Sequence, residues 1–402
     1  MNTPPSPEKI TVPRQVFYAR TNAYTPENMR TALAKTLLPV LQTYGGAKGK
    51  SVMIKPNLLE WKGEKIPVCV DPVMLTELCR MLLAEGAAKV AIIENPAVRT
   101  VPVILECMGI ASTLTGMGVE IKTCADYQFV DMPSNALFQR MEVAQEYRNF
   151  DLIIDFAKAK THGMMTLTLA VKNLFGLIRG SERLGWHLAV GKDYSRFCDM
   201  LLDIYLLVKP HISLLDAVVA MEGNGPGSGD PVELGFIACS GNALTLDASV
   251  CGKMGVPDLL LLDRAEKRGL DTGFADCGDV PAPRSIRLPD PPQMQLEWGV
   301  YFPPKLRNFL RKNLIAKPVV DAKRCIGCGM CAKMCPPRSL QLVNGKPVFK
   351  LSNCIRCFCC QEHCPCGAIT SKKTMLMRYA DQLEKIIRRM SKLFKRKKGK
   401  KS

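Results

Sequence analysis

The chain has 402 residues, of which 47% are apolar, so it can bury the cores of two or three domains. Its formal net charge is +18, and it contains 18 cysteines. This length excludes a small disulfide-stapled secreted domain, and no apolar run approaches the roughly 20 residues of a membrane span.

Residues 10–290 alternate short β-branched runs with helical patterns, which predicts an α/β domain with a mainly parallel sheet. One expected helix begins after Asp71 as cap, has Pro72 in its first turn and ends at Gly86. The expected strands are 51–55, 89–94, 119–123, 151–156, 212–221 and 234–240. The expected helices are 71–86, 103–117, 166–178, 196–208, 243–254 and 257–267.

Two glycine-rich stretches resemble nucleotide-binding loops only superficially. The run at 45–51 has Tyr44 where a phosphate loop needs its first glycine, and it precedes a strand, so we interpret it as a turn. The second run comprises Gly223, Gly225, Gly227 and Gly229, which is not the dinucleotide spacing. It is either a turn after the strand that ends at Met221 or a loop whose amides approach an anion.

Polar residues gather at strand ends and helix starts, where open α/β sheets bind ligands. We expect six of them to converge on an anionic ligand: Lys55, Asn57, Lys160, His162, Lys172 and Asn173. Three more are placed on the facing wall: Asp216, Glu222 and Asn224. The predicted catalytic residues are Lys160, His162, Lys172 and Asp216. The other five are predicted to bind the ligand or a cofactor. A purely structural alternative makes Lys172 and Asp216 a buried ion pair and His162 a helix cap.

Five prolines between residues 281 and 292 mark a domain boundary. We expect a basic linker at 291–318, a small α+β domain at 319–371 and a basic helical tail at 372–402. The tail holds thirteen Lys or Arg and two acidic residues, so it carries most of the net charge. Its apolar residues recur at helical spacing opposite a basic face, which predicts attachment to an anionic membrane surface. Packing on the protein itself or on a partner is the alternative.

The small domain contains the spacing C-x2-C-x2-C-x3-C-P twice, with a period of 29 residues. This is the bacterial ferredoxin pattern for two 4Fe–4S clusters, in which the fourth cysteine of each half ligates the other cluster. One predicted ligand set is Cys325, Cys328, Cys331 and Cys364. The second is Cys354, Cys357, Cys360 and Cys335. Zinc is the alternative, although it favours two separated ligand pairs. The spacing assigns no role to Cys359 or Cys366.

Several stretches together resemble the domain of unknown function 362 family: I-K-P-N-L (54–58), K-A-K-T-H-G (158–163), L-A-V-K-N-L-F-G (169–176), L-L-D-A-V-V-A-M-E-G-N-G-P (214–226) and L-T-L-D-A (244–248). The resemblance covers about residues 45–370. It implies the α/β domain followed by a two-cluster ferredoxin domain. It implies no activity, because the activity of that family is unknown.

Two functions compete. An oxidoreductase would bring electrons from the clusters to a small anionic substrate in the α/β domain. A non-enzymatic electron carrier or assembly partner would instead dock to a redox complex. Either function requires a redox partner protein. Nucleic-acid binding ranks last, since the basic tail lacks interleaved aromatic residues. The amino terminus lacks the apolar core of a signal peptide, and clusters with scattered thiols favour a reducing cytosol of an anaerobe. We therefore expect a cytoplasmic protein, or one peripheral to the inner face of the membrane.

Overall fold

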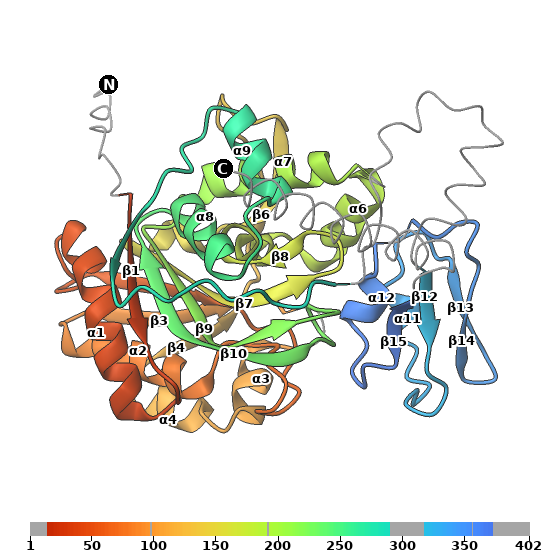
Figure 1. The fold of residues 1–402 in the computed structure, drawn as a ribbon, viewed down its shortest axis with the longest axis horizontal. Coiled ribbons are helices and arrows are strands. Elements are labelled where there is room, and N and C mark those ends of the chain that lie inside the picture. The colour runs from red at the N-terminus through yellow and green to blue at the C-terminus, as the bar shows by residue number, and fades with distance from the viewer. Residues whose placement is uncertain (1–13, 97–98, 191–192, 290–316, 356, 373–402) are drawn as a thin grey trace, which may run out of the picture.

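The computed structural model describes residues 14–372, except 97–98, 191–192, 290–316 and 356. A large α/β unit precedes a small cysteine-rich unit (Figure 1). The expected linker at 291–318 and tail at 372–402 lie outside the described residues, apart from 317–318 and 372. No helix among the described residues is long and apolar enough to cross a membrane.

A nine-stranded mixed sheet forms the centre of the large unit, in the order β11-β1-β10-β9-β7-β2-β3-β4, with β8 paired to β7. The run from β9 to β4 is parallel, whereas β10 is antiparallel to both β9 and β1. This is the expected fold class. The strands are β1 (Gln15–Arg20), β2 (Ser51–Pro56), β3 (Lys89–Glu94), β4 (Glu120–Thr123), β7 (Leu152–His162), β8 (Thr166–Thr168), β9 (Ile212–Glu222), β10 (Asp230–Ser240) and β11 (Ala275–Gly278).

Helices cover both faces of this sheet. Side chains alternate along each strand, so strands that are apolar throughout present apolar residues to both faces. On β2, Val52 and Ile54 belong to one core, and Met53 belongs to the other. The first core is closed by α1 (Pro26–Thr43), α2 (Pro72–Ala84), α3 (Val101–Cys107) and α4 (Ala111–Gly116). The second is closed by α5 (Ala170–Asn173), η2 (Leu174–Leu177), α7 (Tyr194–Val208), α8 (Ala243–Lys253) and α9 (Leu260–Lys267). Helix α6 spans Gly180–Val190, and a hairpin of β5 (Tyr127–Asp131) and β6 (Arg140–Ala144) precedes η1 (Glu146–Asn149).

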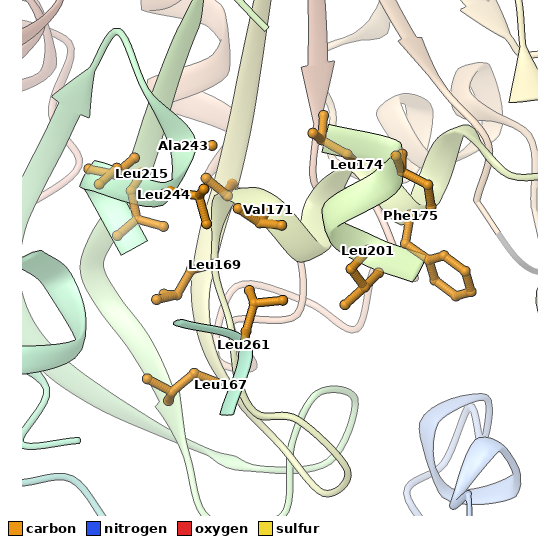
Figure 2. Close-up of a cluster of buried hydrophobic side chains, with 14 of the residues drawn as sticks. Leu167, Leu169, Val171, Leu174, Phe175, Leu201, Leu215, Ala243, Leu244 and Leu261 are labelled. Carbon is orange, nitrogen blue, oxygen red and sulfur yellow. The ribbon is translucent and has the colours of Figure 1, made fainter. Parts of the chain in front are cut away.

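Two expected helices are wrong in form. The helix expected at 103–117 is two helices, because Gly109 takes a left-handed φ of 75° after α3. The helix expected at 166–178 is strand β8 followed by the short α5 and η2. Its residues Leu169, Val171 and Leu174 are buried against neighbouring helices (Figure 2). Periodicity alone does not separate a short buried strand such as β8 from a helical segment.

The small unit repeats one structural half, as its sequence period indicates. Strand β12 (Lys317–Val320) pairs with β15 (Ile369–Lys372), and β13 (Leu340–Val343) pairs with β14 (Lys346–Phe349). The helices α11 (Met330–Lys333) and α12 (Cys359–Glu362) follow Gly329 and Phe358, which are 29 residues apart and both left-handed. Figure 1 shows α12 near the large unit and β13 and β14 at the outer end.

Candidate functional site

A cavity of about 70 Å³ lies at the carboxyl ends of β2, β3 and β7, where open parallel sheets bind ligands. Five of the residues that we expected to converge line it: Lys55, Asn57, Lys160, Lys172 and Asn173. The other lining residues are Leu58, Leu59, Glu94, Asn95, Pro96, Thr168, Phe175, Gly176, Arg183 and Pro226. The charged residues of the lining are four cations and one carboxylate, so the cavity has a cationic character.

Lys55, at the end of β2, forms the most buried ion pair of this lining. Its Nζ contacts the carboxylate of Glu94, at the end of the adjacent strand β3, and lies 3.2 Å from Asn173 Oδ1. The Lys55 side chain is only 1% exposed. A buried lysine needs such a partner, because desolvation of an unpaired charge is costly.

Asn57 connects two walls of the cavity. Its Nδ2 donates to Asn173 Oδ1 at 2.9 Å, and its Oδ1 accepts from Lys160 Nζ at 2.7 Å. Lys160 also donates to the Val68 carbonyl at 2.7 Å, and its residue is 1% exposed. Asn57 therefore orients both an amide and a cation at the cavity wall.

Asn173 in turn binds the buried sheet beneath the cavity. Its Nδ2 donates to Asp155 Oδ1 at 2.8 Å. Asp155 lies in β7 beside Lys55 and is fully buried. Burial raises the pKa of Asp155 well above its usual value, and the nearby Lys55 opposes that effect. The polar layer below the cavity is thus connected to the lining through one asparagine.

Lys172 and Arg183 are the half-buried cations of the lining. Lys172 Nζ lies 5.7 Å from the centroid of the Phe175 ring, and Arg183 Nη2 donates to the Asn95 carbonyl at 2.6 Å. Gly176 leaves space for the ion pair beside them, since a Cβ there would lie 2.2 Å from Glu94 Oε1 and 2.8 Å from Lys55 Nζ.

His162 has a local structural role that differs from the one we expected. It ends β7, is 3% exposed, and its Nδ1 accepts from the backbone N–H groups of Met164 and Met165 at 3.0 and 3.1 Å. It stands outside the lining of the cavity. The turn between β7 and β8 uses this imidazole as an acceptor, in the way that helix termini use a capping side chain.

Asp216 does not face the cavity, which corrects the expected facing wall. It pairs with Lys158 at 2.7 Å, and its Oδ1 accepts from the Tyr24 hydroxyl at 2.6 Å. Both members of the ion pair are buried, with side chains 2% and 0% exposed. The alternative pairing of Asp216 with Lys172 is also wrong. The register irregularity of β7 between Lys158 and Lys160 separates the two neighbouring lysines into different networks.

Glu222 and Asn224 likewise belong to other contacts. Glu222 accepts from the Arg287 backbone N–H at 2.9 Å. The Asn224 carbonyl accepts from Gln361 Nε2 of the small unit at 2.9 Å. The glycine-rich loop packs tightly on β7, because a Cβ at Gly225 would lie 2.1 Å from the Thr161 carbonyl oxygen. This loop is a contact between the two units, and only its Pro226 lines the cavity.

Glu94, Asn95 and Arg183 were missed by the sequence analysis. Glu94 ends β3 and Asn95 follows it, just as Lys55 lies at the end of β2 and Asn57 follows that strand. The same strand-end argument therefore applies to them and predicts their position. Arg183, in contrast, lies on helix α6, which no expected element included.

The cysteines of the small unit line two cavities. One contains Cys325, Cys328, Cys331 and Cys364, together with the additional Cys366. The other contains Cys335, Cys354, Cys357 and Cys360. Each cavity therefore gathers three cysteines of one repeat and the fourth cysteine of the other. This fits two-cluster ferredoxins, in which the fourth cysteine of each repeat ligates the other cluster.

Burial favours the protonated form of the thiols at these positions. Burial raises the pKa of Cys331 to about 11 and that of Cys360 well above its usual value. Iron would supply the positive charge that stabilises thiolates there. No group of three or more His, Cys, Asp or Glu that could hold a single metal ion occurs among the described residues. Cys366 Sγ lies 3.7 Å from Cys364 Sγ, and Cys359 is buried.

Lys62 joins the two units between these sites. It lies in the loop between β2 and α2, and its Nζ donates to the carbonyls of Gly227 at 2.7 Å and Cys364 at 2.9 Å. Burial lowers the pKa of Lys62, while the thiols of Cys364 and Cys366 act in the opposite direction. A single lysine therefore contacts both the glycine-rich loop and the backbone of a candidate cluster ligand.

Comparisons with known proteins agree with this division. The profile of the family described as "Domain of unknown function (DUF362)" matches residues 52–252, and a "4Fe-4S dicluster domain" matches residues 317–365. A thylakoid-associated protein from Synechocystis is 30% identical over 254 residues, which are 63% of this chain and 76% of that protein.

Two solved structures are similar at 14% identity. One is the lactate racemase apoprotein from Thermoanaerobacterium thermosaccharolyticum, with a TM-score of 0.39 over 60% of this chain and 57% of that one. The other is a protein from Thermotoga maritima, with a TM-score of 0.34 over 55% of this chain and 56% of that one. The chain thus spans little more than half of either solved protein. By the two sequence matches, the protein belongs to the DUF362 family and carries an iron–sulfur cluster-binding domain at its carboxyl side.

Proposed function

We propose that the protein is an electron-transfer oxidoreductase that delivers electrons from two 4Fe–4S clusters to a small anionic substrate in the cavity. The observation that carries this proposal is the cationic cavity at the sheet edge, one loop away from the cysteine-rich unit. An electron carrier with no substrate has no need of such a cavity.

The lining favours a carboxylate or a phosphate of few atoms. Lys172 and Arg183 supply cations at half-buried positions, and Lys160 and Asn57 add buried donors. Ammonium, guanidinium and amide N–H groups are the usual donors to these anions. The small volume of about 70 Å³ suits a compact ligand.

Lys160 and Lys172 are the proposed catalytic residues. Each carries an ammonium N–H that can donate a proton to a substrate that gains electrons. Lys55, Asn57 and Asn173 are proposed to hold the anion and to orient Lys160. Because His162 and Asp216 are engaged in other contacts, they are not part of this proposal.

The small unit is proposed to hold the two clusters on the two cysteine sets given above. When bound, the clusters supply single electrons at low potential. The expected composition is about eight iron and eight acid-labile sulfide per chain. Anaerobic iron and sulfide analysis, with low-temperature EPR of the reduced protein, measures this. Stoichiometric zinc without an EPR signal would contradict it.

The substrate site is tested by ligand binding. Anaerobic purification followed by mass spectrometry should identify a co-purifying anion, and titration with inorganic phosphate or acetate provides defined probes. Lys172→Met keeps much of the side-chain stem but removes the charge, so it should weaken anion binding at least tenfold while retaining iron. Lys65→Met is the matched control, since Lys65 is exposed in the loop before α2. Equal binding by both variants would contradict the proposed site.

A redox partner protein is proposed to dock at the outer end of the small unit. Ile326, Val343 and Val348 are 70%, 52% and 53% exposed there, beside the cavity of Cys325 and Cys328. Residues 317–372 contain nine Lys or Arg against two acidic residues. A partner with an acidic rim around an apolar centre fits this surface.

We also propose that the basic tail attaches the protein to an anionic membrane surface. The tail lies outside the described residues, so the proposal depends on its composition. The name of the thylakoid-associated relative supports membrane association of this chain as well.

A further inference from the structure

Lys62 connects a candidate cluster ligand with two segments that line the cavity. Its Nζ lies 2.9 Å from the carbonyl oxygen of Cys364 and 2.7 Å from that of Gly227. Both contacts are hydrogen bonds to backbone oxygens, so they leave the sulfur of Cys364 available to iron. A charged donor forms stronger hydrogen bonds than a neutral one, which favours a fixed position for this ammonium group.

On the cavity side, both segments that meet at Lys62 contribute to the lining. Leu59 lies three positions before Lys62 in the same loop and lines the cavity. Pro226 lines it as well and directly precedes Gly227. The lysine therefore lies within a few residues of the cavity along two separate stretches of chain.

On the cysteine side, Cys364 belongs to only one of the two predicted ligand sets. That set is completed by Cys325, Cys328 and Cys331. The small unit also touches the glycine-rich loop through Gln361, which donates to Asn224 but is neutral. Of these two bridging side chains, only Lys62 places a positive charge against a cluster-ligand residue.

We infer that the cluster on Cys325, Cys328, Cys331 and Cys364 is the immediate electron donor to the cavity, and that Lys62 raises its reduction potential. The inference depends on the proposed function, because it requires two clusters. A positive charge stabilises the reduced cluster, which carries one additional electron, more than the oxidised cluster. When bound, that cluster would supply one electron to the substrate, and a low-potential one-electron carrier protein would resupply it. Lys62 would act through its charge alone, with no bond to it formed or broken.

The test separates the charge of Lys62 from its hydrogen bonds. Lys62→Gln keeps a donor but removes the charge, and Lys62→Arg keeps the charge. Lys65→Met removes an exposed charge from the same loop and serves as the control. In anaerobic redox titrations followed by EPR, Lys62→Gln should lower one of two midpoint potentials. The expected change is about tenfold in the reduced-to-oxidised ratio, or about 59 mV for a one-electron couple.

Lys62→Arg and Lys65→Met should both keep the potentials of the unmodified protein. The hyperfine-shifted cysteine β-proton signals in NMR should assign the lowered potential to the set that includes Cys364. Unchanged potentials in Lys62→Gln, an equal change in Lys65→Met, or a change in the other cysteine set would each overturn the inference. Failure of the proposed function is distinguishable, because it would appear as missing iron or absent anion binding in the unmodified protein.

Discussion

The side-chain amide of Asn57 donates to Asn173 Oδ1 at 2.9 Å, joining the segment after β2 to the last residue of α5. The same side chain accepts from Lys160 at 2.7 Å. One amide therefore fixes the relative position of two walls of the cavity.

Asn57→Ala should loosen the cavity and destabilise the fold. The substitution removes an acceptor of Lys160 Nζ, whereas the contact of that ammonium with the Val68 carbonyl stays. Loss of a hydrogen bond to a buried charge costs about 1–3 kcal/mol. Urea unfolding measures this change. The control is Asn149→Ala at an exposed position, where a change of similar size would show that the cavity network is not responsible.

Gly176→Ala should disrupt the ion pair of Lys55 and Glu94. Its added Cβ would lie 2.2 Å from Glu94 Oε1, so the carboxylate or the chain must move. Overpacking of this kind costs about 1–3 kcal/mol. Gly252→Ala in α8 is a matched control, since a Cβ there meets nothing within 4 Å and alanine favours a helix by about 1 kcal/mol. Thermal unfolding should move in opposite directions for the two variants, and a stabilised Gly176→Ala would contradict the described cavity.

The ion pair of Lys158 and Asp216 should affect stability and not ligand binding. Asp216→Ala leaves the buried Lys158 ammonium without its carboxylate, which costs about 3–5 kcal/mol. The double variant Lys158→Met with Asp216→Leu removes both charges and should recover most of that loss. Denaturant titration measures stability, and phosphate titration of the double variant measures binding. A double variant that folds but loses phosphate binding would show that Asp216 contributes to the anion site.

The sequence alone predicted the sheet edge at which the cavity lies, but not which side chains pair with each other there. The ends of β2 and β7 are recognisable from apolar runs followed by Lys55 and Asn57 or by Lys160. Asp216 looked like a site residue because an acid in an apolar strand is unusual. Which side chain neutralises it depends on the irregular register between Lys158 and Lys160, which no local pattern records.

The cysteine sets were more predictable, because four thiols within eleven residues restrict their own geometry. Helix α5 was less so. Its four residues are positioned by Asp247, distant in sequence, whose carboxylate accepts from the backbone N–H groups of Ala170 and Val171 at 2.8 and 3.1 Å. A tertiary contact of this kind leaves no periodic signal in the segment that it holds.

Asp247 should make the stability of the protein dependent on pH. Burial raises its pKa to about 7 in the folded protein, against about 3.9 for an unperturbed aspartate. The folded state thus keeps a proton that the unfolded state has lost, and stability falls as pH rises from about 4 to about 7. Between about pH 5.5 and about pH 8 this loss is about 2 kcal/mol.

Asp247→Asn should remove that part of the pH dependence, since an amide does not titrate. Urea unfolding of both proteins at the two ends of the range gives the difference directly. The comparison also cancels the contribution of Asp71, whose pKa burial raises to about 7 as well. Parallel pH profiles for the two proteins would show that Asp247 is ionised throughout this range.

The tail prediction concerns attachment to a membrane. Leu376, Leu383 and Ile386 belong to one face of the expected helix, and Arg388, Lys392 and other basic residues occupy the rest. Each basic residue near an anionic leaflet contributes about 1 kcal/mol, so the thirteen Lys or Arg from 372 onward suffice for reversible binding. The full chain should sediment with phosphatidylserine-containing vesicles, and less so as salt rises, because the attraction is electrostatic. A shortened protein that ends at Ser371 should stay in the supernatant while it keeps its iron. Equal sedimentation of the two proteins would place the membrane contact elsewhere, and sedimentation with neutral phosphatidylcholine vesicles alone would replace the electrostatic explanation with an apolar one.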